Sequence, residues 1–123
     1  MGLFPKTVNV GAKRIMTINK LIEILDAKVY NLGEKKEIKS GYAGDFLSFV
    51  MSKAPTDCAW FTVMTNVNVC AVATLAEIAV IVLCDNMIPS ELLEEKVKEQ
   101  GVNLISTNSD VFNAIKIFSK YEN

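Results

Sequence analysis

The side chains on which most protein catalysis depends are scarce in this sequence. There is no histidine, and the only thiols are Cys58, Cys70 and Cys84. Without histidine, the Ser-His-Asp and Cys-His nucleophile systems and every metal site with an imidazole ligand are excluded. None of the cysteines belongs to a CxxC pair and each lies in an apolar run. We therefore expect buried, reduced thiols, with no disulfide framework and no zinc site.

The sequence also lacks the motifs that cradle phosphates or assemble an acid–base pair. Gly41 and Gly44 have no third glycine to complete a dinucleotide fingerprint, and there is no GxxxxGK[ST] loop. Asp45 and Asp85 are the carboxylates that could meet as a pair, but no base, nucleophile or set of metal ligands accompanies them. We predict that the chain is not an enzyme and uses no cofactor and no metal; a small enzyme using Asp45 and Asp85 is the catalytic alternative.

Hydroxyl, amide and glycine residues gather instead in short segments that follow expected strands. The candidate ligand-binding residues are Gly44, Asp45, Thr65, Asn66, Asn68 and Thr107. Parallel strands would bring these segments to one edge of a sheet, where open α/β sheets bind ligands and helix N-termini offer amide donors to anions. An adenine nucleotide or another small phosphorylated metabolite is the ligand class that this setting indicates. Alternatively, the same residues only cap helices and form turns.

The elements that must position these residues follow from hydrophobic spacing. Ile18, Leu21, Ile22 and Leu25 recur at helical spacing, with Thr17 as a possible N-cap. Strands are expected at 27–32, 37–42, 59–63, 79–83 and 102–105.

Four further helices are expected from capping residues and apolar faces. The first opens at Gly44-Asp45 and ends near Pro55, and an apolar helix follows the N-cap candidates Thr65 and Asn66. A charged helix starts at Pro89-Ser90 and stops at Gly101, and the last helix is capped by Asn108 or Ser109.

Strands and helices alternate from residue 59 onward, which is typical of a mostly parallel sheet with helices on both faces. We predict an α/β three-layer sandwich with about five strands. The charged turn at 33–36 also suits a hairpin, so the way in which the first two strands join the sheet is left open.

Residues 1–14 are basic and lack the apolar segment that a signal peptide contains. We expect them to form a flexible arm, with residues 15–123 as a single domain.

Charge and hydropathy limit the partners. The net charge is −1, from 13 basic and 14 acidic residues, so no global field recruits nucleic acid or an anionic membrane. The apolar run 67–84 is interrupted by Asn68, Thr74 and Glu77 and changes from helical to strand character, so we expect no membrane span and a cytoplasmic location.

A small chain that is 50% hydrophobic leaves apolar surface outside its core. We predict a homodimer, through either the 67–76 helix or the helix with Phe46 and Phe49.

Three segments carry a resemblance to a known family. They are 41–48 (GYAGDFLS), 60–73 (WFTVMTNVNVCAVA) and 101–107 (GVNLIST), with Phe112 and Ala114 beyond. Over residues 16–121 the sequence resembles the DRTGG domain family, which is itself similar to the N-terminal domain of HPr kinase/phosphorylase. Thr65 and Asn68 match the family, whereas Met64 and Asn66 stand where it is expected to have glutamine and histidine.

The resemblance implies a small α/β domain that serves as a regulatory or dimerising module beside kinase or nucleotide-sensing domains. The kinase active site of the resembling enzymes belongs to a different domain. We therefore predict a non-catalytic regulatory or assembly module that forms a homodimer, with or without a small ligand to sense; a nucleotide- or phosphometabolite-binding sensor is the alternative. The expected partners are a second copy of the chain, a small phosphorylated ligand or nucleotide, and a signalling protein.

Overall fold

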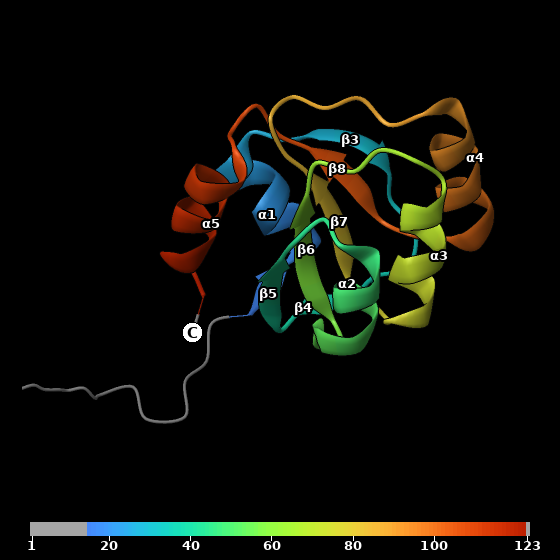
Figure 1. Ribbon diagram of the computed structural model, residues 1–123. Coiled ribbons are helices and arrows are strands. Elements are labelled where there is room, and N and C mark those ends of the chain that lie inside the picture. The colour runs from blue at the N-terminus through green and yellow to red at the C-terminus, as the bar shows by residue number, and fades with distance from the viewer. Residues whose placement is uncertain (1–14, 123) are drawn as a thin grey trace, which may run out of the picture.

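The computed structural model describes residues 15–122; the predicted arm, residues 1–14, and Asn123 lie outside them (Figure 1). The described elements are β2 (Met16–Thr17), α1 (Ile18–Leu25), β3 (Lys28–Asn31), β4 (Glu37–Ile38), β5 (Ser40–Ala43), α2 (Leu47–Lys53), β6 (Cys58–Thr62), α3 (Asn68–Leu75), β7 (Val80–Leu83), α4 (Glu91–Gln100), β8 (Leu104–Ser106) and α5 (Val111–Ser119). The predicted α/β class is confirmed, and the expected helices and strands are present with ends displaced by a few residues, except that the strand expected at 37–42 is divided and the short strand β2 was not predicted.

The main sheet has five strands in the order β3-β8-β7-β6-β5. The pairs β5–β6, β6–β7 and β7–β8 are parallel, whereas β3 pairs with β8 in the antiparallel direction. The sheet is thus mostly parallel, as predicted. Parallel strands need crossover connections, and α2, α3, α4 and α5 follow the parallel strands in turn.

The hairpin alternative for the first two strands is wrong. The expected strand 37–42 is divided at Lys39 into β4 and β5, which pair with different strands. β4 pairs with β2 in a small antiparallel sheet, with Met16 opposite Ile38. β3 and β5 lie at opposite edges of the main sheet. The charged segment between them therefore crosses the end of the sheet and does not form a tight turn.

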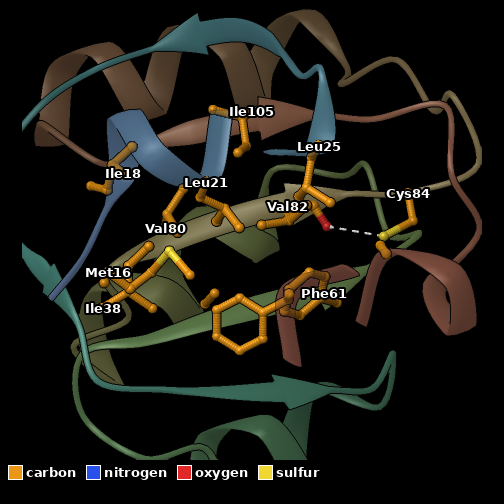
Figure 2. Close-up of a cluster of buried hydrophobic side chains, with 14 residues drawn as sticks. Met16, Ile18, Leu21, Leu25, Ile38, Phe61, Val80, Val82, Cys84 and Ile105 are labelled. Carbon is orange, nitrogen blue, oxygen red and sulfur yellow. Dashed lines mark hydrogen bonds between the residues drawn. The ribbon is translucent and has the colours of Figure 1, made fainter. Parts of the chain in front are cut away.

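Helices cover both faces of the sheet, so the predicted three layers are present (Figure 1). Residues of α1 and α5 share one buried cluster with the sheet, and residues of α2, α3 and α4 share the other. Trp60 and Phe61 illustrate the alternation along β6, because they are both fully buried but belong to opposite clusters. Figure 2 shows the first cluster, in which Leu21 and Leu25 of α1 meet Val80 and Val82 of β7.

Local capping explains several helix boundaries. Thr17 Oγ1 accepts a hydrogen bond from the Lys20 amide at 3.0 Å, as predicted. Ser90 Oγ accepts one from the Leu93 amide at 3.1 Å, which explains why α4 begins at the predicted place. Gly101 ends α4 with a positive φ of 68°, which suits glycine.

Two expected caps are wrong. The cap of α5 is Asp110, whose Oδ1 accepts from the Asn113 amide at 2.7 Å, because the chain from Thr107 to Ser109 turns to bond the neighbouring loop and not the helix. α3 has Val67 at its N-cap position, without a side-chain bond.

The apolar run 67–84 divides into α3 and β7. Among the described residues, no helix has the length and apolar character that a membrane span requires.

Candidate ligand site at the carboxyl edge of the sheet

The topology brings the predicted segments to one edge of the sheet. The parallel strands β5, β6, β7 and β8 all end there, at residues 43, 62, 83 and 106. Backbone hydrogen bonds join the loops that follow. The Ser90 amide donates to Thr65 O at 3.0 Å, and the Asn86 amide donates to Thr107 O at 2.9 Å. The loop between β7 and α4 therefore lies between the other two loops and is bonded to both.

Gly44 and Asp45 are engaged in holding the loop after β5 against β6. Asp45 Oδ1 accepts from Thr62 Oγ1 at 2.6 Å and from the Val63 amide at 3.0 Å. Gly44 O accepts from Trp60 Nε1 at 2.9 Å. Hydrogen bonds to a carboxylate are stronger than neutral ones. The side chain of Asp45 thus has a structural role.

Thr107 lies beneath the edge and not on it. Its side chain is 2% exposed. The hydroxyl donates to Leu25 O at 3.0 Å and accepts from the Ser109 amide at 3.3 Å. The hydroxyl thus acts both as a hydrogen-bond donor and as an acceptor, and Thr107 fixes the loop after β8 to the end of α1.

Thr65, Asn66 and Asn68 form the accessible part of the predicted site. Asn66 and Asn68 are exposed, and Thr65 is partly buried. Asn66 Oδ1 accepts from the Asn68 amide at 2.9 Å, which shapes the turn into α3. Three side-chain donors make no hydrogen bond to another residue within 15–122: the Thr65 hydroxyl, Asn66 Nδ2 and Asn68 Nδ2. These donors are therefore free to bind a ligand.

The electrostatic field at this edge is negative. Burial, followed by the charges of Asp85, Asp110 and Asp45, raises the pKa of the Cys84 thiol to about 12. The loops 44–46, 63–67, 84–90 and 107–110 contain no lysine or arginine. Across residues 15–122, no cluster of three or more Cys, Asp or Glu residues could hold a metal ion. An anionic ligand at this edge would need a bound cation to offset the carboxylates.

The cysteines behave as buried thiols. Burial raises the pKa of Cys58 to about 12 and also raises that of Cys70. All three thiols are free and buried. A nucleophilic thiolate requires a lowered pKa, so these positions do not supply one.

A groove between α3 and α4 was not predicted from the sequence. Its volume is about 450 Å³, and its lining residues are Val67, Asn68, Cys70, Ala71, Thr74, Leu75, Lys96 and Gln100. Asn68 is the one predicted site residue that contributes to it. The feature of the sequence that could have indicated this groove is the pair of small residues at 70–71 on an uncharged helix.

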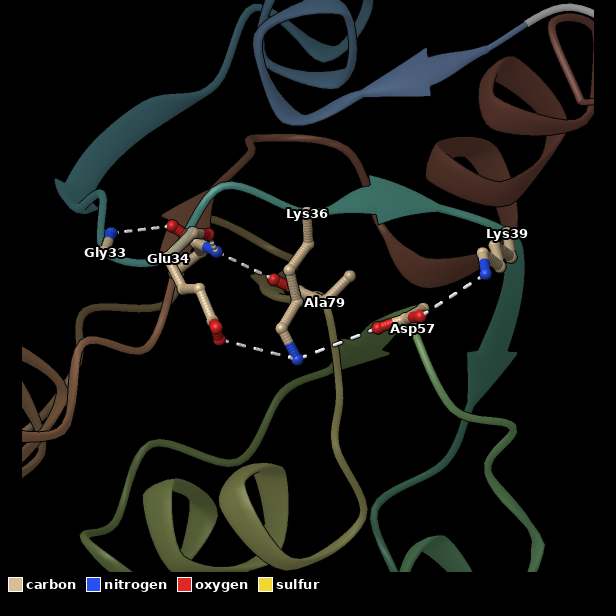
Figure 3. Close-up of polar contacts among 7 residues, drawn as sticks. Gly33, Glu34, Lys36, Lys39, Asp57 and Ala79 are labelled. Atoms are coloured by element: carbon tan, nitrogen blue, oxygen red, sulfur yellow. Dashed lines mark hydrogen bonds and ion pairs between the residues drawn. The ribbon is translucent and has the colours of Figure 1, made fainter.

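A second hollow lies at the other end of the parallel strands, where they begin. It has a volume of about 480 Å³ and is lined by the start of α1, the segment 32–37 and Asn103. Figure 3 shows that Lys36, on its wall, is ion-paired within the chain: Lys36 Nζ lies 3.8 Å from Glu34 Oε1 and 3.7 Å from Asp57 Oδ1. The charge of this lysine is already offset by two carboxylates.

Comparison with known proteins identifies a solved structure with a similar fold. No protein-family model and no curated protein sequence matches the chain. Among solved structures, it is similar to the crystal structure of the CBS and DRTGG domains of the regulatory region of Clostridium perfringens pyrophosphatase, complexed with the activator diadenosine tetraphosphate. The TM-score is 0.72 and the sequence identity is 14%; the match covers 87% of this chain and 47% of that chain.

The chain therefore spans about half the length of this neighbour. The likeness supports a DRTGG-like α/β fold. The similarity to the N-terminal domain of HPr kinase/phosphorylase stays a prediction.

Proposed function

We propose that the chain is a non-catalytic regulatory module, with residues 15–123 acting as one domain, that binds a nucleotide or another small phosphorylated ligand and forms a homodimer. One observation carries the proposal: the fold resembles a regulatory region whose structure holds a nucleotide activator. That ligand belongs to the neighbouring protein, and here it indicates the chemical class to test first. A signalling protein that receives the regulatory output is the further partner proposed, in the cytoplasm, where thiols stay reduced.

The proposed ligand contacts come from Thr65, Asn66 and Asn68. These residues lie between the end of β6 and the first turn of α3, at the edge at which parallel α/β sheets bind ligands, and their side chains donate no hydrogen bond to another described residue. Gly44, Asp45 and Thr107 support the site by holding the adjacent loops in place. Because Asp45, Asp85 and Asp110 make this edge negative, we expect nucleotide binding to be tighter with Mg²⁺, which binds phosphate and carboxylate oxygens together.

A thermal-shift experiment with the full chain tests the proposal. AMP, ATP and diadenosine tetraphosphate are each added with and without Mg²⁺, and binding is confirmed by calorimetry. A ligand at 100 times its dissociation constant stabilises the folded state by about 2.7 kcal/mol. Thr65→Ala and Asn68→Ala should reduce the shift. Asn113→Ala, an exposed asparagine on α5, is the matched control and should leave the shift unchanged.

Two results would overturn ligand sensing. If no compound raises the melting temperature, or if Thr65→Ala and Asn68→Ala leave the shift intact, the chain is an assembly module without this ligand site. The enzymatic alternative has its own test. Turnover of any of the nucleotides by the purified protein, lost in Asp45→Ala or Asp85→Ala, would contradict the non-catalytic assignment.

A further inference from the structure

The helix α2 presents an aromatic ridge to the outside of the molecule. Phe46 and Phe49, which we call the α2 ridge, are 63% and 50% exposed. Their rings pack edge to face, with centroids 4.8 Å apart and an interplanar angle of 76°. Lys53 Nζ lies 4.7 Å from the centre of the Phe49 ring. The ridge is thus ordered before any partner binds, which lowers the entropic cost of association.

The groove lies between α3 and α4, and these helices cover the same face of the sheet as α2 (Figure 1). α2 packs against α3, and α3 packs against α4, so the ridge and the groove lie on either side of α3. A cavity of about 150 Å³ already holds one benzene ring. The groove, at about 450 Å³, has room for a pair of phenyl rings. Ala71 and Cys70 on its wall have short side chains that leave this space open.

Charge permits two copies to meet at this face. The sequences of α2 (LSFVMSK) and α3 (NVCAVATL) contain one charged residue, Lys53. The ammonium group of Lys53 lies over the Phe49 ring. Lys96, at the rim of the groove, is paired with Glu99 at 3.3 Å. Each of these two lysines is therefore already engaged within its own copy, Lys53 by an aromatic ring and Lys96 by a carboxylate, which reduces their repulsion when the face meets its own copy.

The exposed apolar area also suits a dimer. A fully covered aromatic side chain buries about 150–250 Å², so at these exposures the ridge presents on the order of 200 Å². A stable interface covers about 800 Å² on each partner, a little over half of it apolar. Leu75, which is 69% exposed and lines the groove, and the other walls of the groove supply further apolar surface.

We infer that the homodimer is formed by this face, with the α2 ridge of each copy seated in the α3/α4 groove of the other. This inference rests on the self-association proposed above. The ridge and the groove of one copy lie on either side of α3. A two-fold axis that passes over α3 therefore places the ridge of each copy against the groove of the other. The interface is then isologous, with two identical contacts.

Two charge variants and their mixture test the seating. Phe46→Lys and Ala71→Glu each spoil both contacts of their own homodimer, so each protein should be monomeric in sedimentation and light scattering at micromolar concentration. When the two proteins are mixed, one contact is native and the other joins the introduced lysine to the introduced glutamate. A heterodimer should therefore form. Both positions are exposed, and unchanged near-ultraviolet circular dichroism verifies the fold.

Phe112→Lys is the matched control. Phe112 is 70% exposed on α5, which covers the opposite face of the sheet, and this variant should remain dimeric. A wild-type monomer overturns self-association itself. A wild-type dimer that both charge variants leave intact, or that Phe112→Lys dissolves, overturns this face while self-association stands. Two monomeric variants that do not combine overturn the seating of the ridge in the groove. Nucleotide binding is measured separately on the wild-type protein, so that a failure of ligand binding and a failure of this face are distinguishable.

Discussion

Asn103 offers a stringent test of how the polar interior stabilises this fold. It precedes β8, is 3% exposed, and joins three segments of the chain. Its Nδ2 donates to Glu34 O at 2.7 Å and to Ala79 O at 2.9 Å, and its Oδ1 accepts from the Gly33 amide at 2.7 Å (Figure 3). These bonds hold the segment between β3 and β4 against the end of the sheet.

Asn103→Ala should lower the free energy of unfolding by about 3 kcal/mol. Each lost hydrogen bond contributes about 0.5–1.5 kcal/mol net, and the loss of the buried bond to the Ala79 carbonyl adds a desolvation cost. Domains have a total stability of about 5–15 kcal/mol, so the loss is a large fraction of the whole. Asn103→Asp should cost more at pH 7, because it directs a carboxylate oxygen at the carbonyls of Glu34 and Ala79.

The assay is urea unfolding followed by tryptophan fluorescence. Trp60 is the only tryptophan and is fully buried, so its emission shifts to longer wavelength on unfolding. With a slope of about 1.5 kcal/mol per molar urea, the midpoint should fall by about 2 M. Asn113→Ala, at an exposed position, should change stability by less than about 0.5 kcal/mol. A loss below about 1 kcal/mol for Asn103→Ala would refute the reasoning.

Three further outcomes are expected. Asp45→Ala should cost about 2 kcal/mol, because it removes the acceptor of the Thr62 hydroxyl and the Val63 amide; unchanged urea unfolding would contradict its structural role. The three buried thiols should react with a thiol reagent only in denaturant, and rapid labelling in native buffer would contradict their burial. The pKa of Cys58 is raised from 9.0 to about 12, so the folded state holds its proton more tightly, and this thiol alone should lower stability above pH 9 by about 1.4 kcal/mol per pH unit; Cys84, with its pKa also raised to about 12, adds a similar decline. Cys58→Ala should make that decline shallower, and an identical pH profile would contradict the assignment.

Features determined by neighbours in the chain were predictable. The helical spacing of Ile18, Leu21 and Leu25 predicted α1, because one face of a helix must be apolar to pack on a sheet. Thr17 caps its helix as expected, and α4 begins after Ser90 as expected, since an N-cap acts on amides two or three residues away. The β-branched and apolar runs predicted β6 and β7, and the alternation of elements predicted the parallel sheet.

The candidate site was only partly predictable. Topology brings the predicted segments to one edge, as the alternation of strands and helices indicated. Which side chains stay accessible there depends on distant partners. Asp45 bonds Thr62 and Thr107 bonds Leu25, across separations that no local pattern records. Asn66 and Asn68 remain exposed because their turn is satisfied internally.

By itself, the sequence determined the α/β class, the order of the elements, the burial of the thiols and the absence of histidine chemistry. Only the tertiary structure decided that β3 and β5 occupy opposite edges, that the strand 37–42 divides at Lys39, and that α3 and α4 leave a groove beside the α2 ridge. Periodicity and capping arise from interactions within a few residues, so they can be read along the chain. Strand pairing and grooves arise between segments far apart in sequence, where loop closure and packing select among arrangements with the same local pattern.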